Sequence, residues 1–102
     1  MKVTGIEWDR GNVGHFAHHG RCKWNEVEDV LMSRCHRSRA RDQTVEAGSE
    51  ARKVFEGQTC GDRYLLVIAT PKEDGIMRPI TCWPLTGKPR EKYLAWRRSL
   101  PR

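Results

Sequence analysis

Arginines recur on segments whose composition predicts β-strands, and this pattern could carry out chemistry on a charged substrate. They are Arg37, Arg39, Arg41, Arg52, Arg63 and Arg78. A guanidinium on a rigid strand presents a fixed fork of donors that matches the oxygens of a phosphate group. The alternative is that these arginines are ordinary solvent-facing charges on the open side of a small sheet. The residue types alone leave both interpretations open.

Cations also crowd the C-terminal end of the chain, around Tyr93 and Trp96. Residues 88–102 hold one acid, Glu91, against six cations: Lys88, Arg90, Lys92, Arg97, Arg98 and Arg102. The whole chain has 19 Lys and Arg against 13 Asp and Glu, which gives a formal net charge of +6. Such an excess favours an anionic partner, which would be nucleic acid, an acidic protein or a membrane surface. A merely solvated basic tail is the alternative.

Several classes of enzyme lack their motifs in this sequence. There is no P-loop, no dinucleotide-binding glycine pattern and no G-x-S-x-G. No acid pair suggests two-metal chemistry. The stretch "HFAHHGRC" groups three histidines with Cys22, but it has no familiar zinc spacing and no second ligand pair. We therefore predict no metal site and no cofactor.

The four cysteines, at positions 22, 35, 60 and 82, contain no C-x-x-C pair. The N-terminus "MKVTGIEWDR" has no apolar signal region, so we expect four free thiols in a cytoplasmic protein. The longest apolar run, "YLLVIA" at 64–69, is far shorter than a membrane-spanning helix. We expect no membrane association.

A length of 102 residues predicts one domain, residues 1–102. The first half begins with a strand at 2–8. Asp9 is a good N-cap for a helix over 10–20. A second helix is predicted over 23–34, where Trp24, Val27 and Leu31 share one face.

Strands dominate the second half. Strict alternation over 35–42 would place Arg37, Arg39 and Arg41 on one face of a strand, followed by a loop at 43–50. Further strands are predicted at 51–59, 64–70 and 76–83, followed by a helix at 86–99. The run 64–69 should be the central strand because it alone lacks polar alternation. Pro79 cannot donate to a ladder, so its strand should lie near an edge or carry a bulge.

The predicted order is β–α–α–β–β–β–β–α. Hairpin turns join the later strands, so the sheet should be mainly antiparallel, with the helices packed on one face. This is an α+β fold.

Short motifs along this order resemble the BrnT family of type II toxin–antitoxin toxins. They are "IEWD" (6–9), "HHG" (18–20), "EVEDVL" (26–31), Arg52, "GDRYLLVI" (61–68), "RPIT" (78–81) and Tyr93. The resemblance covers about residues 5–97 and leaves a short basic tail, 98–102. The chain departs from the family pattern at Trp83, where an arginine is common, and at Pro89, where an acid is frequent.

The resemblance implies a RelE-like ribonuclease fold and a metal-independent endoribonuclease that cleaves single-stranded RNA. A ribose 2′-hydroxyl would attack the neighbouring phosphate, and arginines would stabilise the charge on the phosphoryl oxygens. By family position, Arg52, Arg63 and Arg78 are the catalytic candidates. Lys92 and Tyr93 would hold the RNA backbone or stack a base. Further candidate RNA contacts, from the strand pattern, are Arg37 and Arg39.

The family resemblance also implies a cognate antitoxin, which we expect to be acidic, of ribbon-helix-helix type and joined to the toxin in a hetero-oligomer. The general base is unassigned, with His15 and His36 as candidates by their usual pKa. His19, beside Gly20, is interpreted as packing at a helix end. Two other readings stay open: a catalytically inactive RNA- or protein-binding module of the same fold, and a small basic interaction protein.

Overall fold

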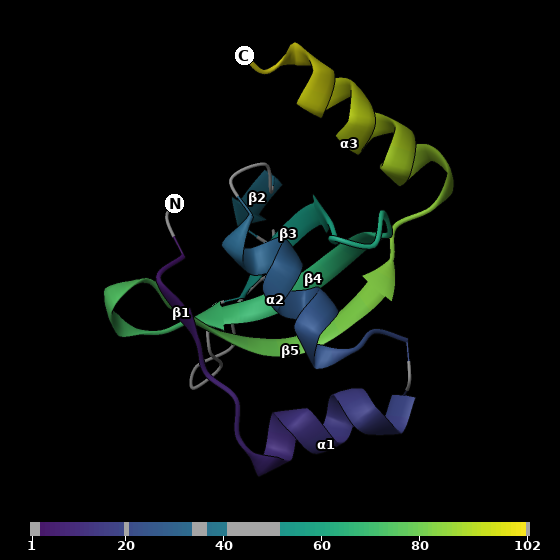
Figure 1. Cartoon of the computed structure of the whole chain (residues 1–102). Helices are drawn as coiled ribbons and strands as arrows, with labels where there is room; N and C mark the ends of the chain where they lie inside the picture. The colour runs from purple at the N-terminus through teal and green to yellow at the C-terminus, as the bar shows by residue number, and fades with distance from the viewer. Residues whose placement is uncertain (1–2, 20, 34–36, 41–51, 102) are drawn as a thin grey trace.

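Helices and strands follow one another in the predicted order (Figure 1). The computed structural model describes residues 3–19, 21–33, 37–40 and 52–101. Arg41, His36 and the loop predicted at 43–50 lie outside these ranges. The described elements are β1 (Gly5–Ile6), α1 (Arg10–His19), α2 (Trp24–Met32), β2 (Arg37–Ala40), β3 (Lys53–Gln58), β4 (Tyr64–Pro71), the short 3-10 helix η1 (Glu73–Gly75), β5 (Ile76–Pro84) and α3 (Gly87–Ser99).

In the described part of the chain, the five strands form one sheet in the order β1-β5-β4-β3-β2. Neighbouring strands are antiparallel except for β1, which runs parallel to β5 over two residue pairs. β4 is the middle strand, so the prediction that residues 64–69 are central is confirmed. The α+β class and the mainly antiparallel sheet are confirmed as well.

The irregularity predicted at Pro79 is present as a bulge in β5. Ile68 pairs with Thr81, whereas the next residue, Ala69, pairs with Pro79. Ile80 is therefore the extra residue on β5, and the register shifts by one across it. A proline has no N–H to give to the ladder, so a bulge beside it costs the sheet little.

Helix α2 crosses one face of the sheet and forms the core with it (Figure 1). Val27, Val30 and Leu31 are fully buried, and they belong to the same cluster as Phe55 and Val67 of the sheet. Alternate residues of β4 thus face the helix, as the two-residue period of a strand requires.

One residue of the predicted apolar face of α2 is placed differently. The sequence places Trp24 on one helical face with Val27 and Leu31, yet it is 56% exposed whereas they are fully buried. It is the first residue of α2. A shared helical face therefore does not guarantee shared burial.

Helix α1 begins where the sequence predicts. The Asn12 amide nitrogen donates to Asp9 Oδ1 over 3.0 Å, and the Asp9 amide donates back to Asn12 Oδ1 over 2.8 Å. Asp9 is therefore the N-cap, in a reciprocal arrangement that satisfies two backbone donors. Phe16 is buried in the same core as α2.

Helix α3 stands apart from α1 and α2, at the top of Figure 1. It is fixed at the end of the sheet where β3 passes into β4. Tyr93 is fully buried and its ring lies edge-on to Tyr64, while Arg97 Nη1 donates to Gln58 Oε1. The prediction that all helices gather on one face therefore holds for α1 and α2 but not for α3. No helix among the described residues is long and apolar enough to cross a membrane.

Candidate nucleic-acid interface

The arginines predicted to act together lie on opposite faces of the sheet. Arg37 pairs with Glu56, and Arg78 pairs with Thr70, on the face turned away from α2. Arg63 instead contacts Glu26 of α2. Arg63 and Arg78 are also at opposite ends of β4, because Thr70, which pairs with Arg78, lies seven positions after Arg63, roughly 23 Å at the rise of a strand. The fold does not bring them to one site.

Arg78 is held by two carboxylates from the segment after β1. Its Nη1 contacts Glu7 Oε1 at 3.2 Å and Asp9 Oδ2, and its Nη2 donates to Asp9 Oδ1 over 3.2 Å. The hydrogen bond from Arg78 lowers the pKa of Asp9, and the bond to the Asn12 amide lowers it further. The same contact raises the pKa of Arg78. A phosphate would have to displace Asp9 and Glu7 to bind this guanidinium.

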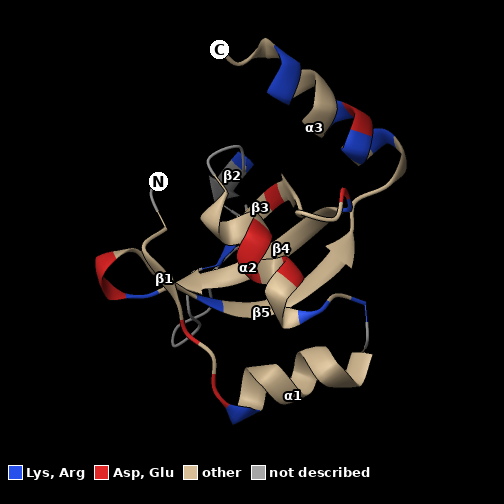
Figure 2. Cartoon of the chain, in the orientation of Figure 1, with Lys and Arg blue, Asp and Glu red and all other residues tan. Residues whose placement is uncertain are grey.

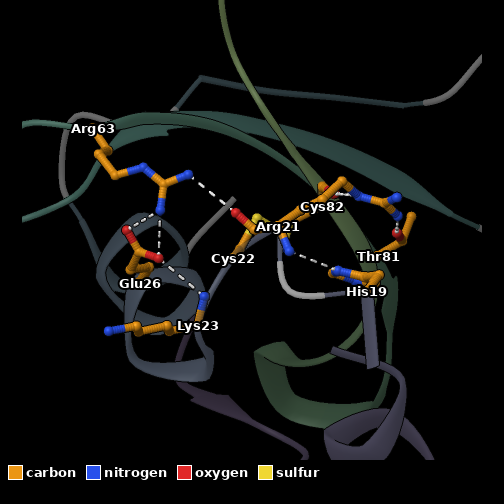
Figure 3. The surroundings of a disulfide bond; sticks show 8 residues. All are labelled: His19, Arg21, Cys22, Lys23, Glu26, Arg63, Thr81 and Cys82. Atoms are coloured by element: carbon orange, nitrogen blue, oxygen red, sulfur yellow. Dashed lines mark hydrogen bonds and ion pairs between the residues drawn. A yellow bond between two sulfur atoms is a disulfide. The ribbon is translucent and has the colours of Figure 1, made fainter. Parts of the chain in front are cut away.

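Arg63 is likewise engaged, on the α2 face (Figure 3). Its Nη1 donates to both oxygens of Glu26, over 2.8 and 2.7 Å, and its Nη2 donates to the Arg21 carbonyl over 3.0 Å. Its side chain remains 45% exposed. The contact therefore joins α2 to the β3–β4 turn at the surface, where such pairs stabilise a fold only slightly.

The remaining candidates differ in accessibility. Arg52 directly precedes β3 and is exposed. Arg37 Nε lies 3.9 Å from Glu56 Oε1, and Arg39 pairs in the register with Val54. Lys92 is exposed on α3, so it can reach a ligand.

Tyr93 is fully buried, so its ring has no free face on which a base could stack. Tyr93 therefore anchors the last helix rather than presenting a surface to RNA. Trp96 lies beside Tyr93, with ring centroids 5.7 Å apart.

Charge is segregated between two helices of the described structure (Figure 2). Helix α2 carries three acids and no cation, whereas α3 carries five cations and one acid. A polyanion is therefore attracted to the end of the molecule formed by α3 and repelled by the outer side of α2. This asymmetry was visible in the sequence, but the separation of the two helices in space was not.

The expectation of four free thiols is wrong. Cys22, in the α1–α2 connection, is joined to Cys82 of β5 by a disulfide with a Cα–Cα distance of 6.5 Å (Figure 3). Cys60 is free and exposed. Sixty residues separate the two partners, so only the fold brings them together.

The disulfide lies beside an arginine that the sequence analysis did not single out (Figure 3). Arg21 Nε donates to the Cys82 carbonyl over 3.1 Å, and its Nη2 reaches Thr81 Oγ1 at 3.4 Å. Its guanidinium carbon lies 4.7 Å from the centre of the Trp83 ring, which is 44% exposed. No sequence signal links Arg21 to Trp83, because their contact depends on where the α1–α2 connection crosses β5.

His19 lies beside Arg21 and is bonded to it as a neutral side chain. Its Nδ1 accepts from the Arg21 amide over 3.1 Å, while its Nε2 is buried and has no hydrogen-bond partner in the described structure. Burial lowers the pKa of His19, and the charges of Arg21 and of the neighbouring His15 and His18 lower it further. Its ring packs against Phe16, as expected for a helix end.

The described residues contain no group of three or more His, Cys, Asp and Glu that could hold a metal ion. Cys22, which a zinc site near the three histidines would have needed, is bonded to Cys82.

No protein-family model matches this chain, and no curated protein matches it. The resemblance to BrnT toxins therefore rests on the order of the short motifs.

Proposed function

We propose that this protein is the toxin of a type II toxin–antitoxin pair, with a BrnT-like, RelE-type fold, and that it acts on single-stranded RNA. The observation that carries the proposal is the agreement between motif order and element order. "RPIT" lies on β5 beside the central strand, and the "EVEDVL" helix covers that strand. The remaining support is electrostatic.

RNA approaches from the end of the molecule that carries α3. Lys88, Arg90 and Lys92 are exposed there, and Glu91 is the only acid of the helix. Contacts between such cations and the RNA phosphates neutralise charge without reading the base sequence, so binding weakens steeply as salt is added. The acids of α2 leave the opposite side unfavourable for RNA (Figure 2).

Cleavage in this proposal needs no metal ion. The ribose 2′-hydroxyl attacks the adjacent phosphate, a P–O bond to the 5′-oxygen breaks, and a cyclic phosphate and a 5′-hydroxyl result. Arginine stabilises the charge that collects on the phosphoryl oxygens. Arg52 is exposed for this role, whereas Arg78 can take part only by exchanging Asp9 and Glu7 for the phosphate.

The test is a cleavage assay on single-stranded RNA in the presence of EDTA, together with growth after expression in a bacterium. We expect cyclic phosphate ends, growth arrest, and at least a tenfold slower reaction in Arg52→Ala and Arg78→Ala, about 1.4 kcal/mol of barrier. Arg10→Ala, at an exposed cation that starts α1, is the matched control. Undiminished rates in Arg52→Ala and Arg78→Ala would remove both residues from the mechanism.

A binding module without cleavage is the second candidate. The observation that favours it is that Arg63 and Arg78 lie on opposite faces and are both bonded to carboxylates. Salt-sensitive RNA binding with intact product after long incubation would select this function over the first.

The proposed partner is an acidic antitoxin of ribbon-helix-helix type, bound in a hetero-oligomer. It would cover α3 and exclude RNA, and opposite charges would make its association fast. The five cations of α3 are Lys88, Arg90, Lys92, Arg97 and Arg98. Changing all five to glutamine should slow association and flatten its salt dependence. A pull-down that returns RNA but no small acidic protein would contradict the antitoxin.

A further inference from the structure

Two tryptophans are strongly exposed among the described residues, and their surroundings differ. Trp24 is 56% exposed at the start of α2, and Trp83 is 44% exposed near the end of β5. An arginine is stacked over Trp83. Large aromatic surface is costly to leave in water, and an aromatic ring beside a cation is the usual platform for an unpaired base.

Arg21 is rigidly placed over this ring. It is bonded to the Cys82 carbonyl and to Thr81, and the adjacent residue, Cys22, is fixed by its disulfide (Figure 3). A guanidinium 4.7 Å from the ring centre is within the range of a cation–π contact. The ring and the cation are therefore held in position before any ligand arrives, which lowers the entropic cost of binding.

Arg21 also has no carboxylate beside its guanidinium in the described structure, unlike three other arginines of the chain. Arg37, Arg63 and Arg78 each contact a carboxylate. Arg21 contacts none in the described structure, since its partners are a carbonyl, a hydroxyl and a ring. An anion can therefore approach this guanidinium without displacing an acid.

Trp83 is continuous with the basic helix. Lys88 follows it by five residues, at most about 18 Å of extended chain, and Lys88 and Arg90 are exposed in the first turn of α3. The first cations of α3 are therefore close enough to Trp83 for one short single strand to span both.

We propose that Trp83 and Arg21 form a base-stacking subsite for single-stranded RNA, in which an unpaired base stacks on Trp83 and its phosphate contacts Arg21. This subsite rests on the proposed RNA function and adds to it the element that binds a base.

The experiment measures binding of a short fluorescein-labelled 2′-O-methyl oligo(A), which cannot be cleaved through a 2′-hydroxyl. Trp83→Ala should weaken binding at least about fivefold, the lower end of the loss when a stacking ring is removed. Trp83→Phe should restore most of the affinity, because a smaller ring still stacks. Trp24→Ala, at the other exposed tryptophan, should bind like wild type.

A second ligand separates base from phosphate. Inorganic polyphosphate has no base, so wild type and Trp83→Ala should bind it with equal affinity. Arg21→Gln should bind both polyphosphate and oligo(A) more weakly than wild type does. Thermal unfolding of each variant shows that the fold is retained. Equal oligo(A) binding by wild type and Trp83→Ala would overturn the subsite alone. A wild-type protein that binds no oligo(A) would overturn the subsite and the RNA function together.

Discussion

Removal of the Cys22–Cys82 disulfide should destabilise the protein by a large and calculable amount. The bond closes a loop with a sequence separation of 60 residues. Chain-entropy estimates give about 3 kcal/mol for a 15-residue loop and about 4.7 kcal/mol for a 100-residue loop. The expected loss on reduction is therefore about 4 kcal/mol, which is a large fraction of the 5–15 kcal/mol that typically stabilises a small domain.

The assay is urea unfolding of the protein with and without a reducing agent. With the slopes usual for small proteins, about 1–3 kcal/mol per molar urea, the midpoint should fall by roughly 1.3 to 4 M. Cys22→Ala/Cys82→Ala should unfold near the reduced wild type and should not respond to reductant. Cys60→Ala, at the free and exposed cysteine, is the matched control and should respond as wild type does.

A count of thiols tests the same pairing directly. The chain has four cysteines, of which Cys35 lies outside the described residues. One pair is joined, so the unreduced, denatured protein should titrate at most two thiols. Four thiols, or an unfolding midpoint that reductant leaves unchanged, would refute the disulfide.

Three further predictions concern a cap, a buried histidine and a buried ring. Asp9→Asn keeps the helix cap but loses the ion pair with Arg78, whereas Asp9→Ala loses both, so thermal midpoints should fall in that order. Because folding lowers the pKa of Asp9, the difference in stability between wild type and Asp9→Asn should be full above the ordinary Asp pKa and should be lost as the pH falls through the folded pKa. His19 has a lowered pKa, so the unfolded chain binds its proton first, and stability should decrease as the pH falls below about 6.5; His19→Asn should flatten that decrease in pH-dependent unfolding, and an unchanged profile would contradict the burial argument. Tyr93→Ala should lower the free energy of unfolding in urea by about 3–5 kcal/mol, because the ring is fully buried. The control Lys92→Ala should leave that free energy nearly unchanged. Equal losses in the two variants would mean that this ring does not anchor α3.

Several features of the fold could be predicted because their causes are local. The Asp9 cap, for example, depends on backbone chemistry within a few residues. The central position of β4 followed from its unbroken apolar run, and the bulge in β5 followed from Pro79. Such features hold wherever the segment is placed in the fold, so the sequence was sufficient.

The candidate site was less predictable because its contacts join distant segments. Arg63 meets Glu26, 37 residues away, and Arg78 meets Asp9, 69 residues away. Alternation along a strand says which residues share a face, but not which face receives the helix or which acid lies opposite. Arg63 and Arg78 therefore appeared equivalent in the sequence, although the structure separates them.

The sequence by itself determined the α+β class, the order of the elements and the excess of positive charge. Each of these follows from residue type and from spacing within one segment. Only the tertiary structure decided that Cys22 meets Cys82, that Tyr93 is buried while Trp83 stays exposed, and that Arg21 stacks on Trp83 without an acid beside it. The physical reason is that strand order, register and the path of the α1–α2 connection set these contacts, and they are properties of the whole chain.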